Sequence, residues 1–210
     1  AGVMARYFDV HPTNPQPRSV SQVADLVRDG GLVAYPTDSG FALGCRMGNR
    51  DALDRIRSLR QLTDKHHFTL VCSEFAQLGE WVQMSNRDFR AIKAVTPGPY
   101  TFILAATREV PRAMLHPRKK TVGVRIPDHV TARALLAELG EPLQSSSLIL
   151  PGEEDPLTDG WTIADNLGHL VDAVLDSGDV GLHPTTVVDL SGDEVQVVRL
   201  GAGDPTPFEQ

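Results

Sequence analysis

Apolar side chains recur along the chain with helical spacing in some segments and strand spacing in others. Over residues 19–29 they repeat at helical spacing after a serine that can cap a helix, and Gly30 supplies a stop. The apolar run 32–35 follows, between Gly31 and Pro36, and is typical of a strand buried on both faces. Helix and strand therefore alternate from the start of the chain.

The rest of the pattern continues this alternation. Helices are expected around Leu53, Ile56 and Leu59 and over 75–81, 89–95 and 130–139, the last ended by Gly140. Strand-like or apolar runs cover 68–72, 101–105, 121–126, 143–150, 171–175, 186–190 and 195–200. The last two, separated by Ser-Gly-Asp-Glu, predict a hairpin. A Gly-rich loop is expected after residue 35, a surface loop over 152–160 and a surface tail after Gly201. Interleaved helices and strands predict an α/β domain on a largely mixed sheet.

Composition places the chain among ordinary globular proteins. Its 210 residues suit one domain, and 41% hydrophobic with 22% charged residues argues against disordered, collagen-like and coiled-coil chains. Twenty Lys and Arg against 27 Asp and Glu give a net charge of -7, so no global positive field attracts nucleic acid or an anionic membrane. Any anion-binding site must therefore be local.

Cysteine usage and hydropathy indicate a reducing compartment. Cys45 and Cys72 are too few for a disulfide framework and lack Cys-x-x-Cys spacing. The chain has no apolar run of about 18 residues, and its start lacks the apolar region of a signal peptide. We therefore expect a cytoplasmic protein that neither spans a membrane nor is exported.

Hydroxyl and guanidinium groups gather at the predicted strand ends. Thr37 and Ser39 directly follow a buried strand, where a ligand crevice of an open α/β sheet lies, although on spacing alone a hydroxyl-rich tight turn is the better explanation. Thr121, Gly123 and Arg125 share one face of a strand, and Arg125 either faces solvent or binds an anion. Further candidate anion partners, each also explicable as loop or surface residues, are Ser145, Ser146, Ser147, Thr185, Thr186 and Arg199.

Several other signals are weak. The basic concentration at Arg112, His116 and 118–120 is better explained as a solvated face than as a nucleic-acid patch. Neither a phosphate loop nor G-x-G-x-x-G occurs. His66 and His67 with Cys72 lack zinc-site spacing, so no bound metal is expected.

Eight of these segments, taken in order, resemble the YrdC/YciO family, and most closely its YciO-like branch. They are GGLVAYPTDSGFALGC, RIRSLRQL, FTLVC, TPGPYTFIL, TVGVRIPDH, GEPLQSSSLILPG, PTTVVDL and VVRLGAG. Because the match is collinear from Ser19 to about Gly203, the resemblance implies a single domain over 19–203, with an N-terminal extension 1–18 and a tail 204–210.

The resemblance implies a twisted open mixed sheet with flanking helices and a concave basic cavity. Its best-characterised branch, threonylcarbamoyl-AMP synthase, condenses L-threonine, bicarbonate and ATP with release of pyrophosphate, for the threonylcarbamoyladenosine modification of tRNA. ATP would enter as its Mg²⁺ complex, with no tightly bound metal. The fold also carries an association with double-stranded RNA or tRNA binding, which stays open as an alternative.

Site residues follow from the same resemblance. The threonine side comprises Thr37, Ser39 and Phe41, with Arg125 holding the carboxylate and Thr185 and Thr186 lining the floor. The nucleotide side comprises Arg60, Thr121, Ser145, Ser147 and Arg199, of which Arg60 and Arg199 would also be catalytic.

Departures from the synthase pattern fall at the reacting end. A Lys-x-Arg pair is replaced by Arg60 and Leu62, and the asparagine of Ser-x-Asn by Ile149. A histidine becomes Val71, and the aromatic hydroxyl of the first loop becomes Phe41. Nearby cations could compensate, namely Arg55, Arg57 and Lys65. Three hypotheses follow: a synthase with weakened or altered activity, a paralogue that binds RNA or a nucleotide without forming the adenylate, and a structural or interaction protein, which fits the polar residues at the strand ends poorly.

Overall fold

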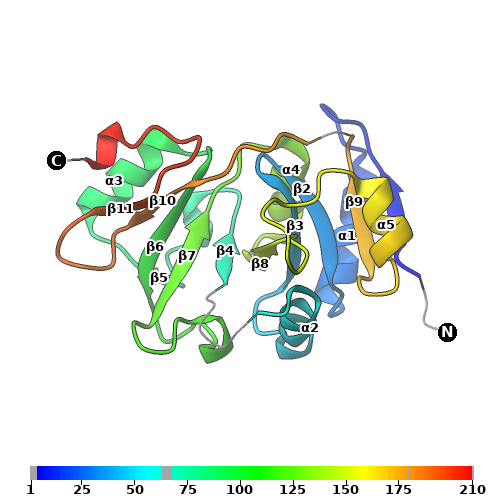
Figure 1. The fold of residues 1–210 in the computed structure, drawn as a ribbon, viewed down its shortest axis with the longest axis horizontal. Helices are drawn as coiled ribbons and strands as arrows, with labels where there is room; N and C mark the ends of the chain where they lie inside the picture. The colour runs from blue at the N-terminus through cyan, green and yellow to red at the C-terminus, as the bar shows by residue number, and fades with distance from the viewer. Residues whose placement is uncertain (1–3, 63–67, 179, 210) are drawn as a thin grey trace.

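One mixed sheet organises the chain. In the computed structural model, which describes residues 4–62, 68–178 and 180–209, eleven strands form this sheet and helices pack on both faces (Figure 1). The strands are β1 (Arg6–Asp9), β2 (Val33–Thr37), β3 (Gly40–Arg46), β4 (Thr69–Val71), β5 (Val82–Gln83), β6 (Tyr100–Ala106), β7 (Thr121–Arg125), β8 (Leu143–Ser147), β9 (Ala173–Asp176), β10 (Thr186–Asp189) and β11 (Gln196–Arg199). The predicted α/β class with a mixed sheet is confirmed.

The helices lie between these strands. The α-helices are α1 (Pro17–Arg28), α2 (Arg50–Arg60), α3 (Asn86–Val95), α4 (Val130–Leu139) and α5 (Gly160–Leu167). Three short 3-10 turns are η1 (Phe75–Gln77), η2 (Arg112–Met114) and η3 (Thr206–Phe208). α4 has the predicted bounds, because Gly140 adopts a φ of 73° and ends the helix in a left-handed cap.

The strand order is β1-β9-β2-β3-β8-β4-β7-β6-β10-β11, with β5 paired to β6. Four neighbouring pairs are parallel (β1 with β9, β9 with β2, β4 with β7, β6 with β10), and the other five along this order are antiparallel. The predicted hairpin between β10 and β11 is present. The two halves of the sheet, β9 to β8 and β4 to β11, lie on opposite sides of the middle of the molecule in Figure 1.

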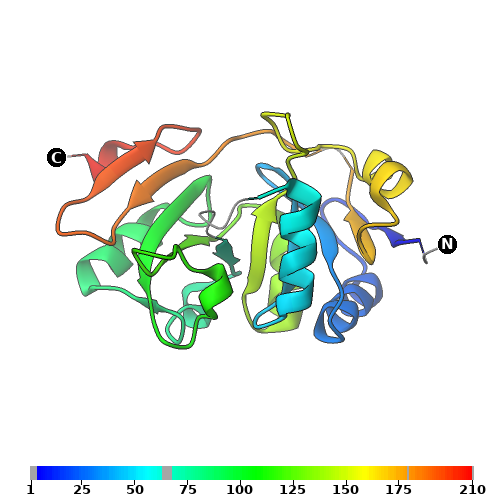
Figure 2. The ribbon, with the colours of Figure 1, turned by 60° about the horizontal axis from the view of Figure 1, so that its bottom comes forward.

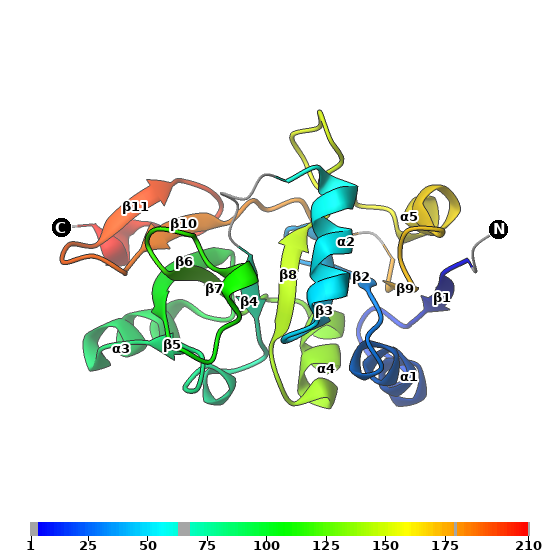
Figure 3. The same cartoon turned by 90° about the horizontal axis from the view of Figure 1, so that it is seen from below.

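Two apolar clusters hold the layers together. Apolar residues of α1 and α4 pack with Val33, Tyr35 and Leu143 on one face, and α2 and α3 pack with Phe41 and Leu70 in the other cluster. Figures 2 and 3 show α2 on the opposite side of the sheet from α1 and α4. Alternate residues of each central strand therefore face different helices.

A hairpin replaces the Gly-rich loop expected after residue 35. β2 runs through Pro36 to Thr37, and β3 starts at Gly40, whose φ of 83° suits glycine. Proline is tolerated because β9 pairs with β2 only at Val33 and Ala34, so no neighbour on that side needs the missing N–H group. The prediction of a loop was wrong because the turn itself contains only Asp38 and Ser39.

Other expectations also change. α1 begins at Pro17 without a side-chain cap, not at a Ser19 cap, since proline is favoured in the first turn. The helix expected over 75–81 is only the turn η1. α5 and the strands β1 and β5 were not predicted.

Both ends of the described chain contribute to the fold. β1 pairs in parallel with β9, so part of the extension 1–18 belongs to the sheet. The tail is not wholly on the surface, because Phe208 is buried with its ring centroid 5.5 Å from that of Phe102. Cys45 and Cys72 are free and buried, and burial raises the pKa of Cys45 to about 11. Among the described helices, none has the length and apolar character needed to cross a membrane.

Candidate functional site

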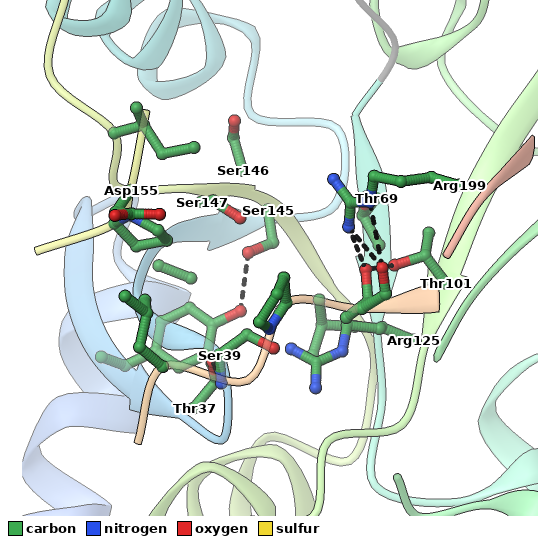
Figure 4. A pocket seen from close by; sticks show the side chains of 18 of the residues that line it. Thr37, Ser39, Thr69, Thr101, Arg125, Ser145, Ser146, Ser147, Asp155 and Arg199 are labelled. Atoms are coloured by element: carbon green, nitrogen blue, oxygen red, sulfur yellow. Dashed lines mark hydrogen bonds between the residues drawn. The ribbon is translucent and has the colours of Figure 1, made fainter. Parts of the chain in front are cut away.

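A cavity of about 140 Å³ lies on the face of the sheet that α1 and α4 cover (Figure 4). Tyr35, Ala42 and Val71 belong both to its wall and to the apolar cluster under these helices. The volume is roughly ten times the space that one water needs. Seven of the eleven predicted site residues line it: Thr37, Ser39, Arg125, Ser145, Ser147, Thr185 and Arg199.

Strand register explains why residues distant in sequence meet here. Ser145 of β8 pairs with Thr69 of β4, which pairs with Gly123 of β7, and all three positions face the cavity side. A Cβ atom at Gly123 would lie 3.0 Å from Thr69 Oγ1. Small and hydroxylated residues therefore form a floor on which a ligand can approach the sheet closely.

The hydroxyls of the first turn are already engaged by the backbone. Thr37 Oγ1 donates to Gly40 O at 2.7 Å and accepts from Ser39 N at 2.9 Å, while Ser39 Oγ donates to His183 O. Thr37 and Ser39 therefore both stabilise a tight turn and line the cavity. Because each hydroxyl proton is used, these oxygens can only accept hydrogen bonds from a ligand.

Arg125 is the buried cation of the wall. Its Nη2 donates to Asp38 Oδ1, and the two side chains are 9% and 12% exposed. Asp38 Oδ2 also accepts from Asp128 N at 3.1 Å, at the turn before α4. Arg125 Nε is buried and has no hydrogen-bond partner among the described residues. The site thus contains a donor that a bound anion could satisfy.

Arg199 approaches the cavity from β11. Its Nε and Nη2 donate to Thr185 O at 3.0 and 2.7 Å, and Nη2 also donates to Thr185 Oγ1 at 2.7 Å. Thr101 Oγ1 lies 2.9 Å from Thr185 Oγ1 and extends this network (Figure 4). A charged donor is therefore held beside two hydroxyls.

The predicted serine array is a strand, β8, and its residues have different roles. Ser145 Oγ donates to Leu43 O at 2.8 Å and lies 2.6 Å from the Tyr35 hydroxyl. Burial raises the pKa of Tyr35 to about 12, so its hydroxyl stays protonated. Ser147 is exposed, and its hydroxyl makes no hydrogen bond within the described part of the chain. Ser147 is thus the serine free to contact a ligand.

Arg60, predicted to be catalytic and nucleotide-binding, is not among the residues that line the cavity. Its Nη1 donates to Ser146 Oγ at 2.5 Å and its Nε to Ile149 O at 3.2 Å, so it supports the wall from α2. Burial lowers the pKa of this guanidinium below its usual value. Ser146 itself lines the cavity, so Arg60 lies directly behind the wall and reaches it through this serine.

Phe41, Thr121 and Thr186 also lie outside the wall. Phe41 alternates with Ala42 on β3 and is fully buried in the other cluster. Thr121 is four residues before Arg125, about 13 Å along the strand, and lines a different surface hollow. Thr186 Oγ1 donates to Gly203 O and accepts from Gly201 N.

A substitution at Phe41 tests this correction. Phe41→Ala should lower the free energy of unfolding by about 3–5 kcal/mol, because it empties a fully buried site. Once folded, the variant should bind L-threonine within about threefold of the wild type. The matched control is Leu182→Ala, a 41% exposed residue of the cavity wall, which should change stability by less than about 0.5 kcal/mol. Urea unfolding and calorimetry measure both quantities.

The acidic residues of the site and the threonines that β4 and β6 contribute were not predicted from the sequence. Glu154 and Asp155 line the cavity from the surface loop after β8, and Thr69 and Thr101 lie in the family segments FTLVC and TPGPYTFIL but were not assigned to the site. Figure 4 shows Asp155 across the cavity from Arg199. The cavity is therefore basic at one end only. Within the described ranges, no group of three His, Cys, Asp or Glu residues could hold a metal ion.

His129 links the site to α4. Its Nδ1 accepts from Ala132 N at 3.2 Å and caps the helix, which requires that nitrogen unprotonated. Burial lowers the pKa of His129 below the usual value of about 6.5, against the opposing effects of Asp38 and Asp128.

The free energy of unfolding should therefore fall as pH drops below about 6.5, because the unfolded chain binds that proton more readily. His129→Asn keeps a capping oxygen that gains no proton in this pH range. The free energy of unfolding of the variant should therefore fall less between pH 7.5 and 5.5 than that of the wild type. Urea unfolding at the two pH values measures the difference; equal losses in both proteins would contradict the role of His129.

The family model described as "Telomere recombination", which covers Sua5, YciO and YrdC proteins, matches residues 25–201. The chain belongs to the Sua5/YciO/YrdC family. It is 47% identical to the uncharacterised protein YciO of Escherichia coli strain K12 over 205 residues, 98% of this chain and 100% of that one. The crystal structure of E. coli YciO superposes with a TM-score of 0.93 over the same shares of the two chains.

More distant members of the Sua5/YciO/YrdC family include a synthase and a protein whose structure contains L-threonine. The chain is 30% identical over 166 residues to a threonylcarbamoyl-AMP synthase of Vibrio vulnificus strain YJ016, covering 78% of this chain and 88% of that protein. P. abyssi Sua5 complexed with L-threonine superposes with a TM-score of 0.84 at 25% identity, covering 93% of this chain and 57% of that one. The predicted family and fold are confirmed.

The cations expected to compensate for family departures are engaged elsewhere. Arg55 pairs with Asp172 at 2.8 Å, and Arg57 donates to Ala113 O. Lys65 lies outside the described residues, as do His66 and His67. Leu62 packs partly buried against the core, whereas Ile149 and Val71 line the cavity. The apolar departures of this family member therefore include two residues of the wall itself.

Proposed function

We propose that this protein is an ATP-dependent synthase of the threonylcarbamoyl-AMP type, which condenses L-threonine, bicarbonate and ATP and releases pyrophosphate. The observation that carries the proposal is Arg125, a buried guanidinium that lines a cavity rich in hydroxyls and whose Nε has no partner among the described residues. The likeness to a Sua5 protein complexed with L-threonine supports an amino acid as the ligand. Activity in the cytoplasm and service to tRNA modification belong to the same proposal.

The donor and acceptor inventory suggests how threonine is oriented. The ligand carboxylate suits the Arg125 guanidinium in the cavity wall, because a guanidinium is a donor only. The Thr37 and Ser39 oxygens, which can only accept, suit the N–H or O–H groups of the amino acid. A carboxylate at these hydroxyls would find no free proton. The arrangement therefore favours threonine with its carboxylate toward β7.

The nucleotide end would be served by Arg199 and Ser147. In the transfer step an oxygen of the threonine carbamate attacks the α-phosphorus of ATP, the bond to the bridging oxygen breaks, and pyrophosphate leaves with the electron pair. ATP enters as its Mg²⁺ complex, and the metal belongs to this substrate. Because no covalent protein intermediate is needed, the rate would come from positioning and from cations near the developing charge.

The apolar part of the wall suggests a slow enzyme. Ile149 lines the cavity where synthases carry an asparagine, and Arg60 donates to Ser146 and to the Ile149 carbonyl, so two of its donors are already engaged. Fewer donors then meet the charge on departing pyrophosphate. Each missing oxyanion donor costs about a hundredfold or more in turnover.

Binding of duplex RNA is the alternative, and the mixed charge of the cavity argues against it. Glu154 and Asp155 in the wall would repel a polyanion. The exposed basic residues 118–120 precede β7, at the opposite end of that strand from Arg125. A nucleic-acid complex at either place should weaken steeply with salt.

Calorimetry tests the proposal at the level of binding. L-threonine and Mg²⁺–ATP should each bind, with affinities that change less than about tenfold between 50 and 200 mM salt. Duplex RNA binding that falls by a thousandfold over that range, with no binding of either small ligand, would replace the proposal with the alternative.

A further inference from the structure

Asp38 and Arg125 form a buried ion pair of which only one partner lines the cavity. Both side chains are nearly enclosed, at 12% and 9% exposure. Arg125 belongs to the cavity wall, whereas Asp38 does not. A ligand in the cavity therefore meets the guanidinium and not the carboxylate.

Asp38 uses both of its oxygens as acceptors. Oδ1 accepts from Arg125 Nη2 and Oδ2 from Asp128 N at 3.1 Å. An asparagine has one acceptor oxygen and one donor nitrogen, so it cannot satisfy both donors. The position therefore calls for a carboxylate, which joins the first turn of the β2–β3 hairpin to the turn before α4.

The pair leaves part of Arg125 unused. Asp38 contacts Nη2 alone, and Arg125 Nε is buried without a partner among the described residues. A buried donor that lacks a partner costs free energy until a ligand or water satisfies it. Because Arg125 also lines the cavity, its fixed guanidinium can bind an anion there.

We propose that Asp38 is a positioning and selectivity residue: it holds Arg125 for a single carboxylate and offsets its charge, so that the site prefers a monocarboxylate to a polyanionic phosphate. The inference rests on the proposed function only in taking a carboxylate as the group bound by Arg125. A balanced pair attracts a monoanion through directed hydrogen bonds, whereas an unbalanced guanidinium attracts anions in proportion to their charge.

Three variants test the inference by calorimetry with two probes, L-threonine and inorganic pyrophosphate. Asp38→Asn removes the offsetting charge and should raise the pyrophosphate affinity relative to that of L-threonine by about tenfold. Asp38→Glu keeps the charge but displaces the guanidinium, so threonine binding should weaken about tenfold with no gain for pyrophosphate. The matched control is Asp172→Asn, since Asp172 also pairs with an arginine, Arg55, and accepts from a backbone N–H, that of Leu32.

The control should lose stability while keeping both affinities within about threefold. If Asp38 were purely structural, its variants would behave in the same way. An unchanged ratio of pyrophosphate affinity to threonine affinity in Asp38→Asn would therefore overturn the inference.

If Asp38→Asn does not fold, Asp38→Glu decides, and unchanged threonine binding in Asp38→Glu would overturn the inference. If the wild type binds no threonine but the pyrophosphate affinity rises in Asp38→Asn, the inference stands and the proposed substrate falls. If the wild type binds threonine but Asp38→Asn leaves the ratio of pyrophosphate affinity to threonine affinity unchanged, the proposed substrate stands and the inference falls.

Discussion

Arg125→Met is expected to weaken L-threonine binding by about a hundredfold or more and Mg²⁺–ATP binding by less than tenfold. Truncating one partner of a buried, hydrogen-bonded charge pair costs about 2–5 kcal/mol, and here the lost donor would be the one that meets the ligand carboxylate. Calorimetry on the folded variant, checked by circular dichroism, measures both affinities.

Arg55→Met is the matched control, because it breaks an Arg–Asp pair outside the cavity. It should leave both affinities within about threefold of the wild type. Equal losses of threonine and ATP binding in Arg125→Met would contradict the assignment of Arg125 to the amino-acid side.

Pyrophosphate release should rise by about tenfold or more in the double variant Leu62→Arg with Ile149→Asn. Ile149 lines the cavity, so the asparagine amide would add a donor beside the departing group. Leu62 packs partly buried against the core, so its replacement should add less and cost some stability. The measurement is the turnover of ATP to pyrophosphate under saturating substrates.

Leu182→Asn serves as the matched control, since Leu182 is another apolar residue of the same wall. It should not raise turnover. An unchanged rate in the double variant would mean that the apolar departures from the synthase pattern do not limit the reaction.

Elements whose periodicity and end signals are both present in the local sequence were predicted correctly. α4 has helical periodicity and a terminal glycine, and the β10–β11 hairpin has two strand-like runs around a turn. α5 was missed because it is short and follows an acidic, Pro-containing segment. β1 was missed because it gains its stability from pairing with β9, far away in the sequence.

The site residues that lie at the ends of strands could be predicted from the sequence. Arg125 and Ser147 could be found because they end strands that face the cavity, whereas Phe41 points to the opposite face of its strand. The Asp38 contact with Arg125 joins residues 87 positions apart and has no local signal. Asp155 came from a segment expected only to be a solvated loop. The roles of Asp38 and Asp155 depend on contacts between residues far apart in the sequence, which local patterns do not reveal.

The central claim is that this cavity makes threonylcarbamoyl-AMP. The most direct measurement is pyrophosphate release from Mg²⁺–ATP by the purified protein with L-threonine and bicarbonate, each component omitted in turn, with mass spectrometry of the product. We expect slow release that requires every component, together with a product of the mass of threonylcarbamoyl-AMP. Absence of release and of that product, in a protein that still binds ATP or duplex RNA, would contradict the claim and assign the cavity to another ligand or reaction.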